Sequence, residues 1–154
     1  MNMEIQAALD VADETDSFLQ ITDVIYDKEA ESGFEALTDA EKTVFCIDNL
    51  LKEMENGGFV QFIHHDVGAY AEETLEALEK IKAKGTYTLL ERLIALFDGK
   101  KIPKDEDERI QMFDHIESEY ADDIAELDDR FYDVGENLVG LTLLFVSKNL
   151  KEFR

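Results

Sequence analysis

Apolar residues recur at intervals of three and four along most of this chain, and that spacing is the strongest constraint on its fold. The clearest run is Tyr120, Ile124, Leu127, Phe131 and Val134. At about 100° per residue, these side chains share one side of an α-helix. No alternation typical of a β-strand continues over several residues, and the chain has only one proline. We predict an all-α fold, an irregular bundle of about six to eight helices in a single domain over residues 1–154.

Capping residues and glycines predict where the helices begin and end. Residues 1–15 are expected to form a short helix or a loose arm, and a helix capped by Asp16 or Ser17 should run to Gly33. Thr38 and Glu41 form a capping box before a helix that ends at the Gly57–Gly58 pair. Further helices are expected over residues 68–83, 86–97 and 136–152, with a break at Gly85 and a long turn over 98–103.

Two separate helices are predicted in the region after residue 104. The first should begin at Asp105 with Ile110 and Phe113 on its inner face, and the second should carry the apolar run that starts at Tyr120. The last helix is apolar on nearly all sides, so we expect it to lie in the centre of the core or to be covered by a second copy in a homodimer.

The net charge of −22, from 37 acidic and 15 basic residues, narrows the classes of partner. Such a surface repels nucleic acid and anionic membranes but attracts basic protein surfaces. Cys46 is the only cysteine and cannot form an internal disulfide. The longest apolar stretch, 138–146, is too short to span a bilayer. No positively charged start followed by an apolar run is present, so we expect no signal peptide. A soluble cytoplasmic protein is the expectation.

The acidic residues are concentrated in two blocks. Residues 1–39 carry a net charge of −10 and residues 105–136 carry −12, whereas residues 40–104 carry −2 and residues 137–154 carry +2. A charge that served solubility alone would be expected to spread more evenly along the chain. The blocks therefore indicate binding surfaces for a basic partner.

A pair of glycines divides the nearly neutral middle of the chain. Both glycines can adopt positive φ, so they can close one helix and redirect the chain. The neighbouring Phe59 and Phe62 would anchor the next turn in the core. We interpret the whole motif as a structural corner: Asn56, Gly57, Gly58, Phe59, Gln61 and Phe62.

This corner and the segment 68–78 after it resemble the signature of the bacterial DNA-mimic-protein-19-like family, much of which is a domain of unknown function. The resemblance is sharp over residues 45–98 and weaker over the acidic-aromatic run 127–132. The founding member of that family is an acidic, all-helical dimer that occupies the DNA-binding surface of a transcription regulator. The resemblance thus implies a protein-binding role without catalysis, and it implies a homodimer.

The second acidic block places a row of carboxylates on one helix face, about 5 Å apart along the axis. The row points away from the apolar run and comprises Glu119, Asp122, Glu126, Asp129 and Asp133. A spaced row of negative charge can engage lysines and arginines arranged to bind phosphates. We predict a DNA-mimic-like inhibitor that covers the basic surface of a nucleic-acid-binding protein. Secondary candidates are Asp105, Glu106, Asp107, Glu108, Asp23 and Asp27.

Three alternatives remain open at this point. An immunity-type protein that blocks a basic nuclease toxin would use the same electrostatics. A small-molecule pocket or hydrolase site near Gly57, Gly58, Gln61, His64 and His65 belongs to another class. The third is a scaffold whose acidity serves only solubility.

Catalysis and metal binding have weak support in the sequence. Residues 105–116 begin like a calcium loop but lack the glycine at its sixth position, and Ile116 stands where the bidentate glutamate belongs. Adjacent histidines such as His64 and His65 diverge on a helix, which disfavours zinc ligation. Cys46 has no activating base near it in the sequence. We therefore expect no enzyme activity, no cofactor and no metal.

Overall fold

The structure is a computed structural model that describes residues 2–154, and this part of the chain contains eight α-helices and no β-strand. The all-α prediction is confirmed. The helices are α1 (Met3–Leu9), α2 (Glu14–Ser32), α3 (Asp39–Asn56), α4 (Phe59–His64), α5 (Ala71–Lys80), α6 (Lys84–Ala95), α7 (Glu106–Val134) and α8 (Leu138–Lys148). Short 3₁₀ turns occupy Phe34–Ala36, Asp66–Tyr70, Asp98–Lys100 and Leu150–Glu152.

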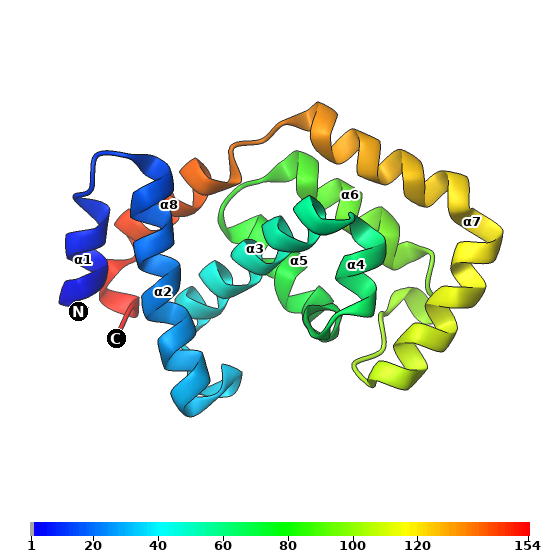
Figure 1. Cartoon of the computed structure of the whole chain (residues 1–154), viewed down its shortest axis with the longest axis horizontal. Coiled ribbons are helices and arrows are strands. Elements are labelled where there is room, and N and C mark those ends of the chain that lie inside the picture. Colours follow the sequence, from blue (N-terminus) through cyan, green and yellow to red (C-terminus); the bar gives the residue numbers. More distant parts are fainter. Residues whose placement is uncertain (1) are drawn as a thin grey trace.

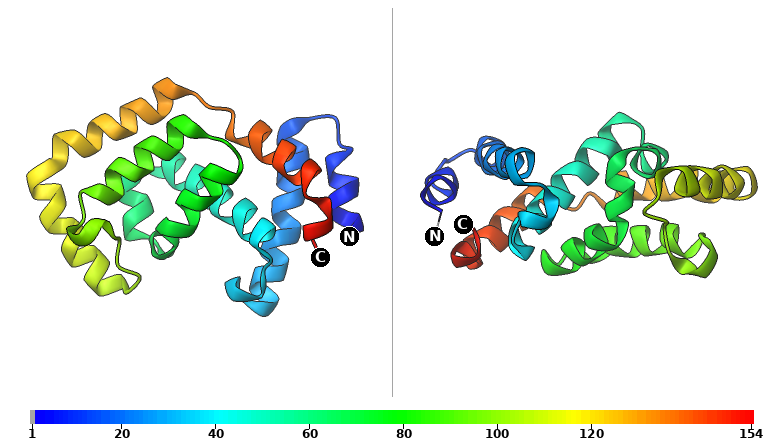
Figure 2. Two further views of the ribbon diagram at one scale, coloured as in Figure 1. Left: turned by 180° about the vertical axis from the view of Figure 1, so that it is seen from behind. Right: turned by 90° about the horizontal axis from the view of Figure 1, so that it is seen from below.

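The molecule is elongated, with α1, α2 and α8 at one end and α7 at the other (Figure 1). Helices α3 to α6 fill the middle, and α7 arches around them along the outer edge. The view from behind and the view from below show the same arrangement (Figure 2). One hydrophobic cluster runs through the middle layer, and its fully buried members include Ile47, Leu50, Phe59, Phe62 and Phe113.

Residues 3–9 form the docked helix α1, which is the helical one of the two alternatives expected for residues 1–15. Asn2 caps α1 with its side chain, and its backbone N–H donates to the carbonyl of Phe153 at 3.0 Å. Ile5 is buried in the core. Helix α2 begins earlier than predicted because Asp13, rather than Asp16 or Ser17, caps it. Ser17 is buried and donates instead to the carbonyl of Ala8 at 2.8 Å.

The capping box at Thr38 and Glu41 is confirmed, but the boundaries around α5 differ from the prediction. Helix α5 begins at Ala71, after a 3₁₀ turn that contains Gly68. The break before α6 lies at Lys82, whose φ is +66°, so the predicted break at Gly85 was wrong. Gly85 lies in the first turn of α6, where its N–H donates to the carboxylate of Glu136 at 3.1 Å.

Residues 106–134 form one helix of 29 residues, where two helices were predicted. A local kink at Tyr120, with φ −123° and ψ 29°, separates the two predicted segments without ending the helix. Phe113 is buried as expected, whereas Ile110 is only half-buried. Arg109 takes the buried position beside it.

Helix α8 does not lie in the centre of the core, so the first of the two alternatives expected for it was wrong. Its buried side consists of Leu138, Thr142 and Val146, while Leu144 is 52% exposed. It packs on α2 and α3 at one end of the molecule, which leaves part of its apolar surface uncovered. Over residues 2–154, no helix has both the length and the apolar character needed to cross a membrane.

Candidate binding face and the motifs that position it

The acidic row predicted on α7 is exposed along its whole length. Ile124 and Leu127 are buried on the opposite side of the helix, as the apolar spacing predicted. Tyr120 and Val134, at the two ends of the apolar run, are 39% and 42% exposed, so the buried stripe is shorter than expected. Burial of the inner side leaves the carboxylates free to contact another molecule.

Two members of the row have a nitrogen-bearing side chain four residues away on the same helix. Arg130 pairs with Glu126 one turn earlier, with 2.7 Å between Nη2 and Oε1. His115 Nε2 lies 3.7 Å from Glu119. Glu119 also precedes the kink at Tyr120, whereas Asp122, Glu126, Asp129 and Asp133 follow it. The regular part of the row is therefore 122–133, about 16 Å long at 1.5 Å per residue.

The secondary acidic candidates lie outside this row, at the start of α7 and on α2. Residues 105–108 are all exposed at the start of α7, where the Asp105 carboxylate caps the helix by accepting from the Glu108 N–H at 3.0 Å. Asp23 and Asp27 are exposed on α2, at the other end of the molecule (Figure 1). The two acidic blocks thus form separate faces.

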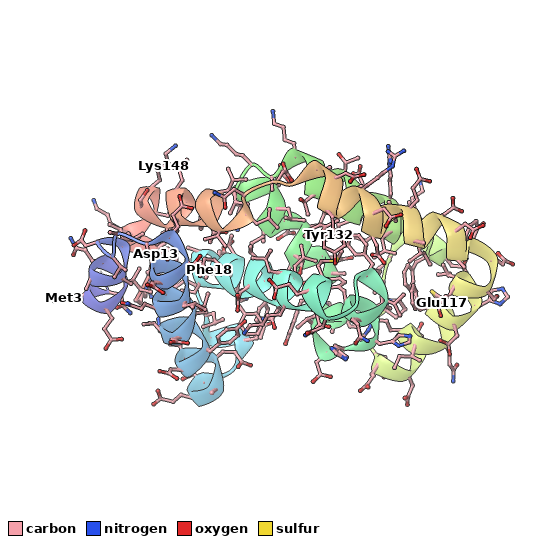
Figure 3. The ribbon with its side chains drawn as sticks, turned by 45° about the horizontal axis from the view of Figure 1, so that its top comes forward. Met3, Asp13, Phe18, Glu117, Tyr132 and Lys148 are labelled. Atoms are coloured by element: carbon pink, nitrogen blue, oxygen red, sulfur yellow. The ribbon has the colours of Figure 1, made fainter. Side chains whose placement is uncertain are left out.

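The glycine corner packs directly against the inner side of α7. The Phe59 N–H donates to the Asp128 carboxylate at 2.9 Å, and the Phe59 and Phe131 rings meet edge to face at 6.4 Å. The Tyr132 hydroxyl donates to the Met54 carbonyl at 2.5 Å. Figure 3 shows Tyr132 on the side of α7 that faces the middle layer. The segments 56–62 and 127–132 therefore meet and hold α7 in place.

The sequence predicted that both paired glycines can adopt positive φ, but only Gly58 lies in the left-handed region. Gly57 is extended at φ 174°, and Gly58 has φ +85°. Gln61 is half-buried beside the corner. Gly58, Phe59 and Phe62 are buried in the interior. Their burial supports a structural role for this motif.

Asp128 is a key residue that the acidic-row prediction passed over. It is half-buried and acts as an external cap for α4. Burial raises the pKa of its carboxyl above the usual range, and the hydrogen bond from Phe59 opposes that rise. Its position four residues after Ile124 places it on the apolar side of the helix, and that was the available signal.

Arg109 is the second residue that was missed. Its side chain is almost fully buried, and its guanidinium donates only to backbone carbonyls, at 2.8–3.3 Å. These carbonyls belong to Ile63, His65, Pro103 and Lys104. Gly68 makes room for it, since a Cβ there would lie 2.8 Å from Nε. Arg109 precedes Phe113 by four residues, which placed it on the inner face.

The two adjacent histidines pair with different carboxylates. His65 Nδ1 lies 2.6 Å from Glu53, and His64 Nε2 lies 3.8 Å from Asp114. Among the described residues, no three His, Cys, Asp or Glu side chains are grouped so that they could hold a metal ion. Burial raises the pKa of Cys46 to about 12, so the thiol stays protonated at neutral pH and is a poor nucleophile.

This geometry defines a class of acidic helical protein. Its exposed row of carboxylates lies on α7, and the packed segments 56–62 and 127–132 hold that helix in place. The chain belongs to the DMP19-like protein family, whose model matches residues 35–149. The matched range includes α3 to α8 and leaves out α1 and α2, with Asp23 and Asp27. No curated protein and no solved structure matches the chain.

Proposed function

We propose that this protein is an acidic binding module that inhibits a DNA-binding protein by covering its basic, phosphate-contacting surface. The exposed row on the outer side of α7 is the observation that carries the proposal. Membership of the DMP19-like family supports it, because resemblance to that family implies a protein-binding role without catalysis.

The spacing of the row suits cationic side chains that normally reach for phosphates. Successive carboxylates lie about 5 Å apart along the axis, compared with about 3.4 Å of rise per phosphate on a DNA strand. Long lysine and arginine side chains can absorb this difference because their stems are flexible. Binding should weaken as salt rises, since exposed charges are screened beyond about 10 Å at 0.1 M ionic strength.

The client is to be captured from a lysate at low and at high salt and identified by mass spectrometry. Recovery of one basic DNA-binding protein at low salt supports the proposal if DNA and this protein then compete for the purified client. A nuclease as client would point to the immunity-type role. Competition that fails for every captured protein would exclude mimicry.

The triple variant Glu126→Gln, Asp129→Asn and Asp133→Asn should bind the client about ten- to a hundredfold more weakly at low salt. It removes three exposed charges without touching the buried side of α7, so its thermal midpoint should stay close to that of the unchanged protein. Calorimetric titration gives the affinity, and circular dichroism gives the midpoint.

The matched control is Glu72→Gln, Glu76→Gln and Glu79→Gln, which neutralises three exposed acids on α5. It has the same net charge as the α7 variant and should retain most of the affinity. Equal losses for the two variants would mean that total charge, and not the row on α7, attracts the client. A loss on Asp23→Asn with Asp27→Asn alone would transfer the site to α2.

A further inference from the structure

A groove between α8 and the turn from α5 to α6 combines apolar walls with a basic rim. One hollow of about 280 Å³ is lined by Ile81, Leu141, Leu144 and Phe145 on its apolar side. A second hollow of about 400 Å³ is lined by Leu78 and Tyr87. Lys82 lines both hollows, so they adjoin one another. We call the two hollows together the α8 groove.

The rim of the α8 groove carries Lys80, Lys82, Lys84 and Lys148. In the part of the chain that the structure describes, none of these four lysines forms an ion pair, whereas Lys28, Lys42, Lys52 and Lys104 each do. Glu79 is the one acidic residue among the lining side chains. A protein of net charge −22 thus keeps a local excess of positive charge free at this groove.

Helix geometry explains part of this arrangement. Lys80 and Lys148 are the last residues of α5 and α8, where positive charge is favourable. That effect accounts for Lys80 and Lys148, but not for Lys84 at the start of α6 or for the apolar surface of the groove. Leu144 is half-exposed, and Leu141 and Phe145 are only partly covered. Lys148 projects away from the body of the molecule (Figure 3).

The charges of the rim distinguish between the occupants that could cover the groove. A second copy packed through a two-fold axis would bring one lysine rim against another, and like charges repel. An anionic amphiphile such as a fatty acid needs a cavity that encloses most of its surface. The α8 groove instead consists of two neighbouring hollows in which Leu144 is 52% exposed and Tyr87, Leu141 and Phe145 are partly exposed, a shape that suits a longer segment.

We propose that the α8 groove binds an acidic amphipathic segment of another protein, whose apolar side chains enter the hollows while its carboxylates pair with the lysine rim. The α8 groove has the opposite charge to the row on α7, so the two surfaces would bind partners of opposite charge. The proposal does not depend on the function proposed for α7.

The test uses a synthetic peptide of about 18 residues with leucines on one helical face and glutamates elsewhere. Titrated into the ¹⁵N-labelled full chain, it should shift the backbone amides around Lys82, Leu144 and Lys148. A matched peptide with lysines in place of the glutamates should leave those amides unmoved. A peptide with serines in place of the leucines should bind much more weakly.

Two variants test the two halves of the recognition. Lys80→Gln with Lys148→Gln should weaken the acidic peptide about three- to tenfold by fluorescence anisotropy. Leu144→Ser should weaken it at least as much, and it should not unfold the protein because Leu144 is half-exposed. The control Lys100→Gln with Lys101→Gln removes two exposed lysines outside the groove and should change nothing.

Three outcomes would overturn the proposal. The first is an acidic peptide whose affinity is the same for the groove variants and the control. The second is dodecanoate shifting the groove amides when the peptide does not, which identifies a lipid-like occupant. The third is Leu144→Ser converting a dimer to a monomer in sedimentation, which shows that a second copy covers α8.

Discussion

Replacing Arg109 with methionine should lower the free energy of unfolding by about 3–5 kcal/mol. Methionine fills most of the space of the side chain but cannot donate to the four carbonyls that Arg109 satisfies. Two of these carbonyls, from Ile63 and His65, lie at the end of α4, where a short helix leaves acceptors without partners. Each buried acceptor that loses its donor costs about 1–3 kcal/mol.

The loss should appear as a fall of about 10 °C in the thermal midpoint, measured by circular dichroism, and as a lower midpoint in urea. The thermal midpoint of Arg109→Lys should lie between those of the unchanged protein and Arg109→Met, because an ammonium reaches fewer of the carbonyls than the planar guanidinium does. Arg92→Met is the matched control, since Arg92 is an exposed arginine on α6. If Arg109→Met unfolded as Arg92→Met does, the carbonyls must find other donors.

Gly58→Ala is expected to cost about 3 kcal/mol of stability. The backbone there has φ +85° and ψ −159°, a region that residues with a Cβ rarely occupy. A Cβ would also lie 2.5–2.7 Å from the carboxylate of Asp128. That carboxylate must then move, and the Phe59 N–H loses its acceptor.

Gly33 offers a control with nearly the same backbone. Its φ is +87° and its ψ is 162°, but a Cβ there would have no atom within 4 Å. Urea unfolding of Gly33→Ala therefore measures the conformational cost alone, and Gly58→Ala should cost clearly more. On an Asp128→Ala background, the two substitutions should become similar in cost. Equal costs in the unchanged background would rule out the contact with Asp128 as the cause.

The repeating apolar positions predicted the helices well because they record which side of each helix is buried. On α3, the spacing of Val44, Ile47, Leu51 and Met54 predicts one inner face; Leu51 is half-buried and the other three are fully buried. The same spacing placed the acidic row on the outer side of α7. Around Tyr120 the same spacing led to the prediction of two helices, whereas the structure has one helix with a kink there.

Residues with a polar group on a buried face were the ones that could not be interpreted from the sequence. Asp128 and Arg109 both lie on apolar sides of α7, and their partners come from residues 44–69 positions earlier in the chain or from the preceding loop. A helical wheel shows that such a residue faces inward, but it does not show which backbone groups will be its hydrogen-bond partners. Gly85 was misread for the same reason, because the approach of Glu136 explains it better than a break.

The division of α7 into an anchored inner side and an unanchored outer side leaves its exposed positions open to change. Asp128, Phe131 and Tyr132 hold the helix on the protein, whereas Asp122, Glu126, Asp129 and Asp133 contribute little to its anchoring. Evolution, or a protein engineer, can therefore rewrite the outer positions for a new target while the scaffold stays intact. The charge pattern on the outer side of α7 can therefore change without a change of fold.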